Sequence, residues 1–166
     1  LILQVVSLEQ KIGLNKQAKQ RILETLEGNV PSEKMWQFWI ELQLTQDASK
    51  DVSADLIEML SQFPESEWAG VKLAEIFLHD EKYAAAEKVI EKAMEESTES
   101  ASLKILWGRL LAIQGKWSEA LTAFSSIEKN VGGVPLLNHQ ALAYRKSGKT
   151  HISLKLVEYS LLNHDW

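Results

Sequence analysis

Histidine is the residue of this sequence best suited to chemistry, because its side chain binds metal ions and transfers protons near neutral pH. The histidines are widely separated in the chain, at His79, His139, His151 and His164. No two of them are four residues apart, and the motif His-Glu-x-x-His is missing. The pattern therefore predicts no metal site.

The sequence also lacks the motifs that activate a nucleophile or hold a phosphate group. It contains no cysteine, which excludes thiolate catalysis, disulfides and cysteine-based zinc sites. No Gly-x-Ser-x-Gly motif occurs. The pair Gly132-Gly133 is followed by no Lys-Ser or Lys-Thr, so it predicts a loop rather than a phosphate site. We expect no catalytic residues and no cofactor, and predict that the protein is not an enzyme.

Charge and hydropathy exclude two further classes of partner. The chain has 18 Lys and Arg against 23 Asp and Glu, and its basic residues are dispersed, which disfavours nucleic acid. No apolar run approaches the roughly 18 residues that cross a bilayer, so we expect no membrane insertion by this segment. Cytoplasm and bacterial periplasm both remain open as locations. Because the sequence begins at Leu1 rather than at Met, we expect it to be a fragment of a longer protein.

The elements that position these side chains are predicted to be helices. Among the 166 residues there are only 3 prolines and 8 glycines, and Ala, Leu, Glu, Lys and Gln dominate. We therefore predict an all-α fold. The ten expected helices are 1–12, 15–28, 33–45, 51–62, 67–79, 83–96, 101–114, 117–129, 135–147 and 150–163.

The sequence repeats itself with a period of about 34 residues, a length typical of helical repeats. LAEIFLHDEKYAAAEKVIEKA, residues 73–93, then aligns with WGRLLAIQGKWSEALTAFSSI, residues 107–127. Small residues coincide at two places in the unit, Ala74 with Gly108 and Ala86 with Ala120. Amphipathic helices of an ordinary bundle would also give periodic apolar matches, but they do not explain small residues that recur at two separate positions.

This pattern resembles the tetratricopeptide repeat, a helix-turn-helix unit of the same length. The resemblance implies a right-handed α-solenoid of antiparallel helix hairpins that fills the chain as one domain, 1–166. The second repeat is degenerate, with Ile40 and Val52 at places where small residues are expected, and in the fifth Ser153 replaces the second-helix alanine. The expected repeats are 1–32, 33–66, 67–100, 101–133 and 134–166.

The resemblance assigns structural roles to the small residues. They are expected where the two helices of a hairpin cross, with Gly108 facing Ala120 and Ala74 facing Ala86, while Gly115 ends a helix and turns the chain. The residues expected to have this packing role are Ala74, Ala86, Gly108, Ala120 and Ala141.

The resemblance also implies a concave groove lined by the first helix of each repeat, in which a peptide or helix of another protein would bind. The expected groove residues are Lys34, Gln37, Glu41, Trp68, Val71, Glu75, His79, Arg109, Asn138, Arg145 and Lys146. Some proteins of this family bind a chaperone's C-terminal carboxylate through groove Lys, Asn and Arg residues. Val71, Glu75 and Ile105 occupy places in that set, so we expect no chaperone tail as the ligand.

Tryptophans and chain ends leave alternatives open. Trp36 and Trp39 would either fill the core of the degenerate repeat or form an exposed anchor for a partner, and Trp68 is a candidate groove anchor. The first helix and helix 150–163 both have more apolar residues than one buried face needs. They would pack on a flanking element or on another chain, including a second copy.

We therefore expect a protein-protein interaction scaffold that binds its partner in the groove, through its ends, or both. A place in a bacterial secretion or envelope assembly is the narrower expectation. The alternative is a regulatory or oligomerisation domain fused to a catalytic domain outside this segment.

Overall fold

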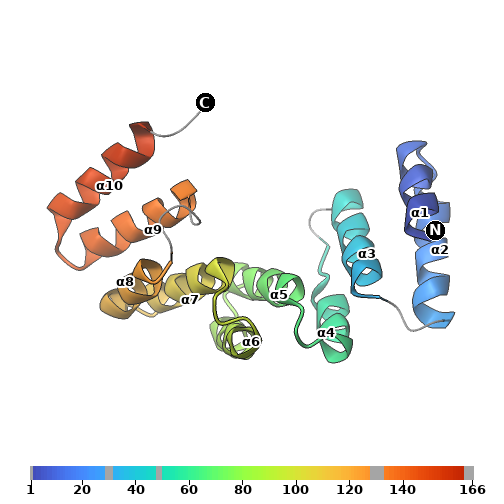
Figure 1. Ribbon diagram of the computed structural model, residues 1–166, viewed down its shortest axis with the longest axis horizontal. Helices are drawn as coiled ribbons and strands as arrows, with labels where there is room; N and C mark the ends of the chain where they lie inside the picture. The colour runs from blue at the N-terminus through green and yellow to red at the C-terminus, as the bar shows by residue number, and fades with distance from the viewer. Residues whose placement is uncertain (1, 29–31, 48–49, 128–132, 163–166) are drawn as a thin grey trace. The chain divides into compact units, whose positions relative to one another are not determined.

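The computed structural model describes residues 2–28, 32–47, 50–127 and 133–162 of the chain. These residues form ten helices and no strand, in the order expected (Figure 1). The all-α prediction is therefore confirmed, and the helix ends differ from the expected ones by a few residues. The helices are α1 Ile2–Lys11, α2 Asn15–Gly28, α3 Glu33–Gln46, α4 Ser53–Gln62, α5 Glu67–His79, α6 Tyr83–Glu96, α7 Ala101–Ile113, α8 Trp117–Ser125, α9 Gly133–Lys146 and α10 Thr150–Leu162.

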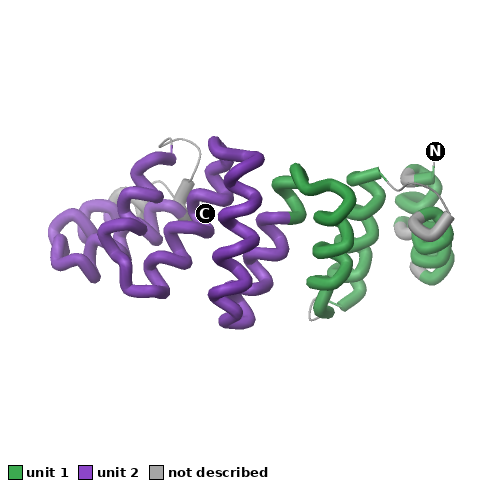
Figure 2. The backbone as a smooth tube through the Cα atoms, turned by 90° about the horizontal axis from the view of Figure 1, so that it is seen from below, with its two compact units in different colours: residues 1–69 green, residues 70–166 purple. Residues whose placement is uncertain are grey.

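The chain divides into two compact units, residues 1–69 and residues 70–166 (Figure 2). The boundary falls inside α5. Each unit is built from antiparallel helix hairpins joined by short turns, as the helix order requires. The extent of the predicted single domain stays a prediction.

The first helix of several hairpins ends at a residue whose backbone has the left-handed conformation. Gly13, Gly115 and Gly148 have φ of 80°, 78° and 83°, a conformation that glycine adopts without steric cost. After α7 the amide of Lys116 donates to the carbonyl of Leu111 at 2.9 Å, and the amide of Gly115 donates to that of Ala112 at 3.1 Å. This pair of hydrogen bonds is the Schellman motif, which satisfies the last carbonyls of a helix. The predicted turn at Gly115 is therefore confirmed.

Glu81 ends α5 with the same motif, although it is not a glycine. Its φ is 60°, and it has the position in its repeat that Gly115 has in the next one. The amide of Lys82 donates to the carbonyl of Phe77 at 2.8 Å, and the amide of Glu81 donates to that of Leu78 at 3.3 Å. A residue with a Cβ is strained in this conformation, so the hydrogen bonds of the turn hold Glu81 there.

Trp36 and Trp39 belong to the core of the first unit. They are 7% and 5% exposed, and their indole N–H groups donate to Gln62 and Asp55 of α4, each at 3.3 Å. Gln43, also buried, donates to the other carboxylate oxygen of Asp55 at 2.7 Å. These residues therefore join α3 to α4. The alternative of an exposed aromatic anchor at Trp36 and Trp39 is wrong, because large side chains fill the space between these helices.

The degenerate repeat has a shifted second helix. The N-cap residue is Val52 in α4 and Lys82 in α6. Helix α4 therefore begins four positions later in its repeat than α6 does. The small residue Ala86 lies four residues after its cap, and the corresponding residue of α4 is Leu56. Leu56 and Val52 are both fully buried. The turn before α4 is thus longer, and a large side chain lies where the other hairpins place a small one.

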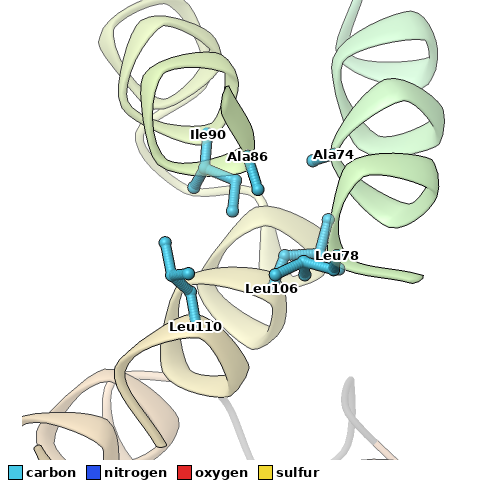
Figure 3. Close-up of a cluster of buried hydrophobic side chains, with 6 residues drawn as sticks. All are labelled: Ala74, Leu78, Ala86, Ile90, Leu106 and Leu110. Atoms are coloured by element: carbon cyan, nitrogen blue, oxygen red, sulfur yellow. The ribbon is translucent and has the colours of Figure 1, made fainter. Parts of the chain in front are cut away.

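Among the described residues of the second unit, apolar side chains form two core clusters. The first lies between α5, α6 and α7, with Ala74 and Ala86 among the leucines and isoleucine drawn in Figure 3. The second joins α7, α8 and α9, and Ala120 and Phe124 are buried in it. Ala141, on α9, is 4% exposed. All the small residues expected to pack are therefore buried.

The contact of Gly108 differs from the expected one. A Cβ built on Gly108 would lie 2.3 Å from Cε1 of Phe124, and the three closest atoms all belong to that ring rather than to Ala120. Gly70 has a similar role that the sequence analysis missed, because its Cβ would lie 3.0 Å from the Cβ of Ala93. Its position four residues before Ala74 on α5 was the available signal.

Candidate functional site

The predicted groove residues lie on the first helices of the hairpins, and none of them is buried. Helix α3 carries Lys34, Gln37 and Glu41, and α5 carries Trp68, Val71, Glu75 and His79. Arg109 is on α7, and α9 carries Asn138, Arg145 and Lys146. Gln37, Trp68, Val71, Glu75 and Arg109 are half-buried, and the others are exposed. Their assignment to one groove stays a prediction.

Several of these side chains have local partners. Gln37 donates to Glu33 at 3.0 Å, and Lys72 forms an ion pair with Glu75 at 3.2 Å. Both contacts lie along one helix, so they fix the side chains without joining two helices. A ligand that binds Glu75 would compete with Lys72, at small cost because both side chains are over two fifths exposed.

The end of α5 carries a small charged group at its surface. Asp80 contacts Lys82 at 2.9 Å and His79 at 3.3 Å. The hydrogen bond from Lys82, followed by the one from His79, lowers the pKa of Asp80 below its ordinary value. His79 thus lies at a solvated helix end, as the sequence indicated.

Val71 contributes to the core as well as to the surface. Its side chain packs against the cluster of Ala74, Ala86 and their neighbours. This leaves only part of Val71 for contact with a ligand, so the polar residues on the same helix are better candidates.

The structure brings two of the predicted residues together in one concavity. Asn138 and Arg145 of α9 line it with Leu142, and Ser153 and Val157 of α10 form its other side. The concavity is open and mostly apolar. Its polar groups include the guanidinium of Arg145 and the amide of Asn138. It can receive an apolar side chain beside a polar or anionic group.

The charge of Arg109 affects His139, a residue that was not among the predicted site residues. His139 of α9 stacks on Phe124, with ring centroids 5.9 Å apart and an angle of 14° between the planes. Burial lowers the pKa of His139, and the positive charge of Arg109 lowers it further. His139 therefore packs as a neutral aromatic residue between α8 and α9, and no spacing in the sequence distinguished it from the other histidines.

Within the described residues, no three His, Asp or Glu side chains gather in a way that could hold a metal ion. In the same part of the chain, no helix has the length and hydropathy needed to cross a membrane.

The fold matches those of solved repeat proteins. A tetratricopeptide repeat protein from Parabacteroides merdae superimposes on 99% of this chain with a TM-score of 0.75 and 16% sequence identity. The chain has the tetratricopeptide repeat fold. It spans 65% of the length of that protein.

Two structures of MamA have the same fold. One matches over 96% of this chain and 88% of MamA, with a TM-score of 0.76 and 16% identity. MamA from Desulfovibrio magneticus matches over 96% of this chain and 91% of its own length, with a TM-score of 0.76 and 10% identity. No family model and no curated protein matches the sequence. At such identities the likeness concerns the fold, which the tetratricopeptide pattern of the sequence predicted.

Proposed function

We propose that the protein is an interaction scaffold that binds a peptide or helix of another protein along the first helices of its hairpins. The supporting observation is the difference between the buried and uncovered sides of these helices in the second unit. Their core sides are apolar, whereas Glu75 on α5, Arg109 on α7 and Arg145 on α9 remain accessible. Charges of both signs along the helices favour a partner segment that itself carries both signs.

A groove variant with conserved net charge tests this proposal. The groove variant combines Glu75→Lys with Arg109→Glu and so reverses the charge at two predicted groove residues. The matched control combines Glu91→Lys with Lys92→Glu and reverses two exposed charges on α6. Tagged wild type, groove variant and control are used to capture proteins from a lysate, and circular dichroism confirms that each is folded. We expect one protein to be captured by wild type and control and lost with the groove variant. Equal capture by all three would rule out these residues as the binding surface.

Self-association through the terminal helices is a second candidate function, favoured by a specific observation. Leu8 on α1 and Leu154 on α10 are 60% and 66% exposed. Burial of such side chains stabilises an assembly by about 25 cal/mol for each Å² removed from water. Light scattering of the purified protein at rising concentration tests this, and a constant monomer mass would exclude it.

A narrower role in a bacterial secretion or envelope assembly, or as an oligomerisation domain beside a catalytic domain, depends on the full-length protein. Its sequence and its location in the cell are the direct tests. A catalytic domain in the same full-length chain would favour the second of these roles.

A further inference from the structure

Helices α7 and α9 are a positively charged part of an acidic chain. The formal net charge is −5, yet neither helix contains Asp or Glu. Their cations are Lys104, Arg109, Arg145 and Lys146. The two helices contact each other, and each is the first helix of its hairpin. Positive charge therefore gathers on neighbouring first helices of the second unit.

The cations differ in whether the protein itself supplies a counter-ion. Lys104 forms an ion pair with Glu99 at 2.9 Å, and its side chain is only 14% exposed. In the part of the chain that the structure describes, no ion pair or hydrogen bond joins the side chains of Arg109, Arg145 or Lys146 to another residue. These three charges are available to a ligand.

Arg109 needs a counter-ion most. Arg145 and Lys146 lie in the last turn of α9, where a positive charge also complements the helix dipole. Arg109 precedes the last turn of α7, so the dipole does not account for it. It is also half-buried, and a charge that is partly removed from water is unfavourable without an opposite charge. An anion supplied by a ligand would satisfy it.

Apolar side chains lie beside these cations. Ile113 follows Arg109 by four residues on α7 and is 47% exposed, and Leu142 precedes Arg145 by three residues on α9 and is 40% exposed. Residues at these spacings are neighbours on one side of a helix. Each helix therefore offers an apolar contact next to a positive charge.

The two helices alternate in chemistry at equivalent positions. When their hairpins are aligned on the glycines that end the first helices, Arg109 corresponds to Leu142 and Ile113 corresponds to Lys146. At each of these positions one helix has a cation and the other has an apolar side chain. A segment that lies on both helices therefore needs carboxylates and apolar residues at neighbouring positions.

The exposure of Arg109 and Ile113 does not depend on where the sequence ends. Another hairpin follows α7, and α9 of that hairpin packs on both α7 and α8. Ile113 and Arg109 remain accessible in its presence. Their accessibility therefore reflects the positions that a first helix leaves uncovered within the stack.

Helix α5 does not extend this surface. At the positions of Arg109 and Ile113 it has Glu75 and His79. Glu75 is paired with Lys72 of the same helix at 3.2 Å, so the two charges offset each other. The surface that attracts anions is thus formed by α7 and α9.

We infer that the uncovered side of α7 and α9 binds an acidic amphipathic segment of the partner protein, with a carboxylate at Arg109 and an apolar side chain at Ile113. The inference rests on the function proposed above and names the chemistry of the segment that lies on these two helices. Arginine can bind a carboxylate through two parallel hydrogen bonds, which fixes the position of the segment. Burial of Ile113 and Leu142 adds affinity in proportion to the apolar area removed from water.

Selection from random peptides tests the chemistry without a known partner. Peptides displayed on phage are selected on the purified wild-type protein, and their composition is compared with that of the unselected library. We expect enrichment of Asp and Glu, with Leu, Ile or Phe one helical turn away. One enriched peptide is then synthesised, and its affinity is measured by fluorescence anisotropy.

Variants of Arg109 locate the carboxylate. Arg109→Gln removes the charge and keeps much of the side chain, and it should weaken binding of the peptide by about tenfold. Lys92→Gln, at an exposed position of α6, is the matched control and should bind like wild type. Circular dichroism verifies that each variant is folded. Arg109→Glu should abolish binding, and exchange of one glutamate of the peptide for lysine should restore it.

The outcomes separate this inference from the function on which it rests. Selected peptides with no excess of acidic residues, whose binding is lost with Glu75→Lys and Arg109→Glu together, would overturn the acidic chemistry and leave the groove as the binding surface. Equal affinity of wild type and Arg109→Gln for an acidic peptide would overturn the contact with Arg109. Selection of no peptide, or of peptides that bind the groove variant as tightly as wild type, would contradict the groove itself.

Discussion

The ring of Phe124 occupies the space into which a side chain at Gly108 would extend, with Cε1 only 2.3 Å from the position of a Cβ. Phe124 is 1% exposed and also stacks on His139, so its ring cannot turn toward solvent. Gly108 is therefore required by the packing of α7 on α8, although glycine inside a helix costs roughly 1 kcal/mol relative to alanine.

Gly108→Ala should destabilise the protein despite the higher helix propensity of alanine. Overlap with a buried ring costs about 1 to 3 kcal/mol, which exceeds the gain in propensity. The larger Gly108→Leu should cost more and separate the two helices. Urea denaturation followed by circular dichroism measures the change in the free energy of unfolding.

Phe124→Leu provides the test of the cause. If the ring is responsible, the cost of Gly108→Ala in a Phe124→Leu background will be smaller than in wild type, and a double-mutant cycle gives the coupling. Ser102→Ala, at an exposed position of α7, is the control for changes on this helix. Equal costs of Gly108→Ala in both backgrounds would contradict the assigned contact.

Glu81→Gly should stabilise the protein. Glu81 has φ of 60°, and the left-handed conformation costs a residue with a Cβ about 1 kcal/mol or more, whereas glycine adopts it freely. The greater entropy of glycine in the unfolded chain offsets part of this gain, so we expect an increase of about 0.5 to 1 kcal/mol. The shift in denaturation midpoint at constant slope checks it.

The reverse change at the equivalent turn is the counterpart. Gly115→Ala should cost about 1 kcal/mol, because φ there is 78° and no neighbouring atom lies within 4 Å of the added Cβ. Because the two turns have the same geometry, Glu81→Gly should raise the free energy of unfolding and Gly115→Ala should lower it. A loss of stability in Glu81→Gly would indicate that contacts of the glutamate side chain outweigh the backbone term.

The fold and the helix ends could be predicted because local signals repeat along this chain. Gly13, Gly115 and Gly148 end helices by their backbone freedom, and small residues such as Ala86 recur at a fixed distance after every hairpin turn except the one before α4. These are properties of one hairpin, so they can be read without knowledge of its neighbours.

The details that could not be predicted depend on contacts between distant residues. Gly108 contacts Phe124, and Asp55 accepts hydrogen bonds from Trp39 and Gln43. Both contacts depend on the rotation of each helix about its own axis relative to its neighbour. The longer turn before α4 shifts the register of the degenerate repeat, and the sequence marked it by Ile40 and Val52 at places where small residues are expected. The predicted groove residues lie on the expected helices, because the repeat period alone assigns them to the first helix of each hairpin.

Asp55→Leu should destabilise the first unit by about 1 to 3 kcal/mol. The carboxylate accepts from Trp39 at 3.3 Å and from Gln43 at 2.7 Å, and its loss leaves two buried donors without their acceptor. Asp55→Asn keeps one acceptor oxygen and should cost less. Chemical denaturation gives both values.

The control for Asp55 is Glu58→Leu on the same helix. Glu58 also accepts a hydrogen bond from a glutamine, Gln62, at 3.0 Å, but this contact is exposed. We expect its loss to change the free energy of unfolding by no more than about 0.5 kcal/mol. Equal effects of the two leucine variants would show that burial of the network around Asp55 is not what stabilises the α3 and α4 hairpin.

His139 should make stability depend on pH below its ordinary pKa of 6.5. Burial, and then Arg109, lowers the pKa of His139 in the folded protein, so the unfolded chain binds the proton more readily. The contribution of neutral His139 is therefore fully present above the unfolded pKa and is lost as the pH falls from about 6.5 toward the lower folded pKa. Denaturation at about pH 7.5 and about pH 5.5 spans much of this change.

His139→Phe isolates the titration from the packing, since a phenyl ring can still stack on Phe124. We expect the difference in stability between the two pH values to be smaller in His139→Phe than in wild type. His151→Phe, at an exposed position of α10, is the matched control for the exchange of a histidine for phenylalanine. If His139→Phe retained that dependence in full, the protonation that weakens the fold would have to occur elsewhere, and the stacked ring would serve packing alone.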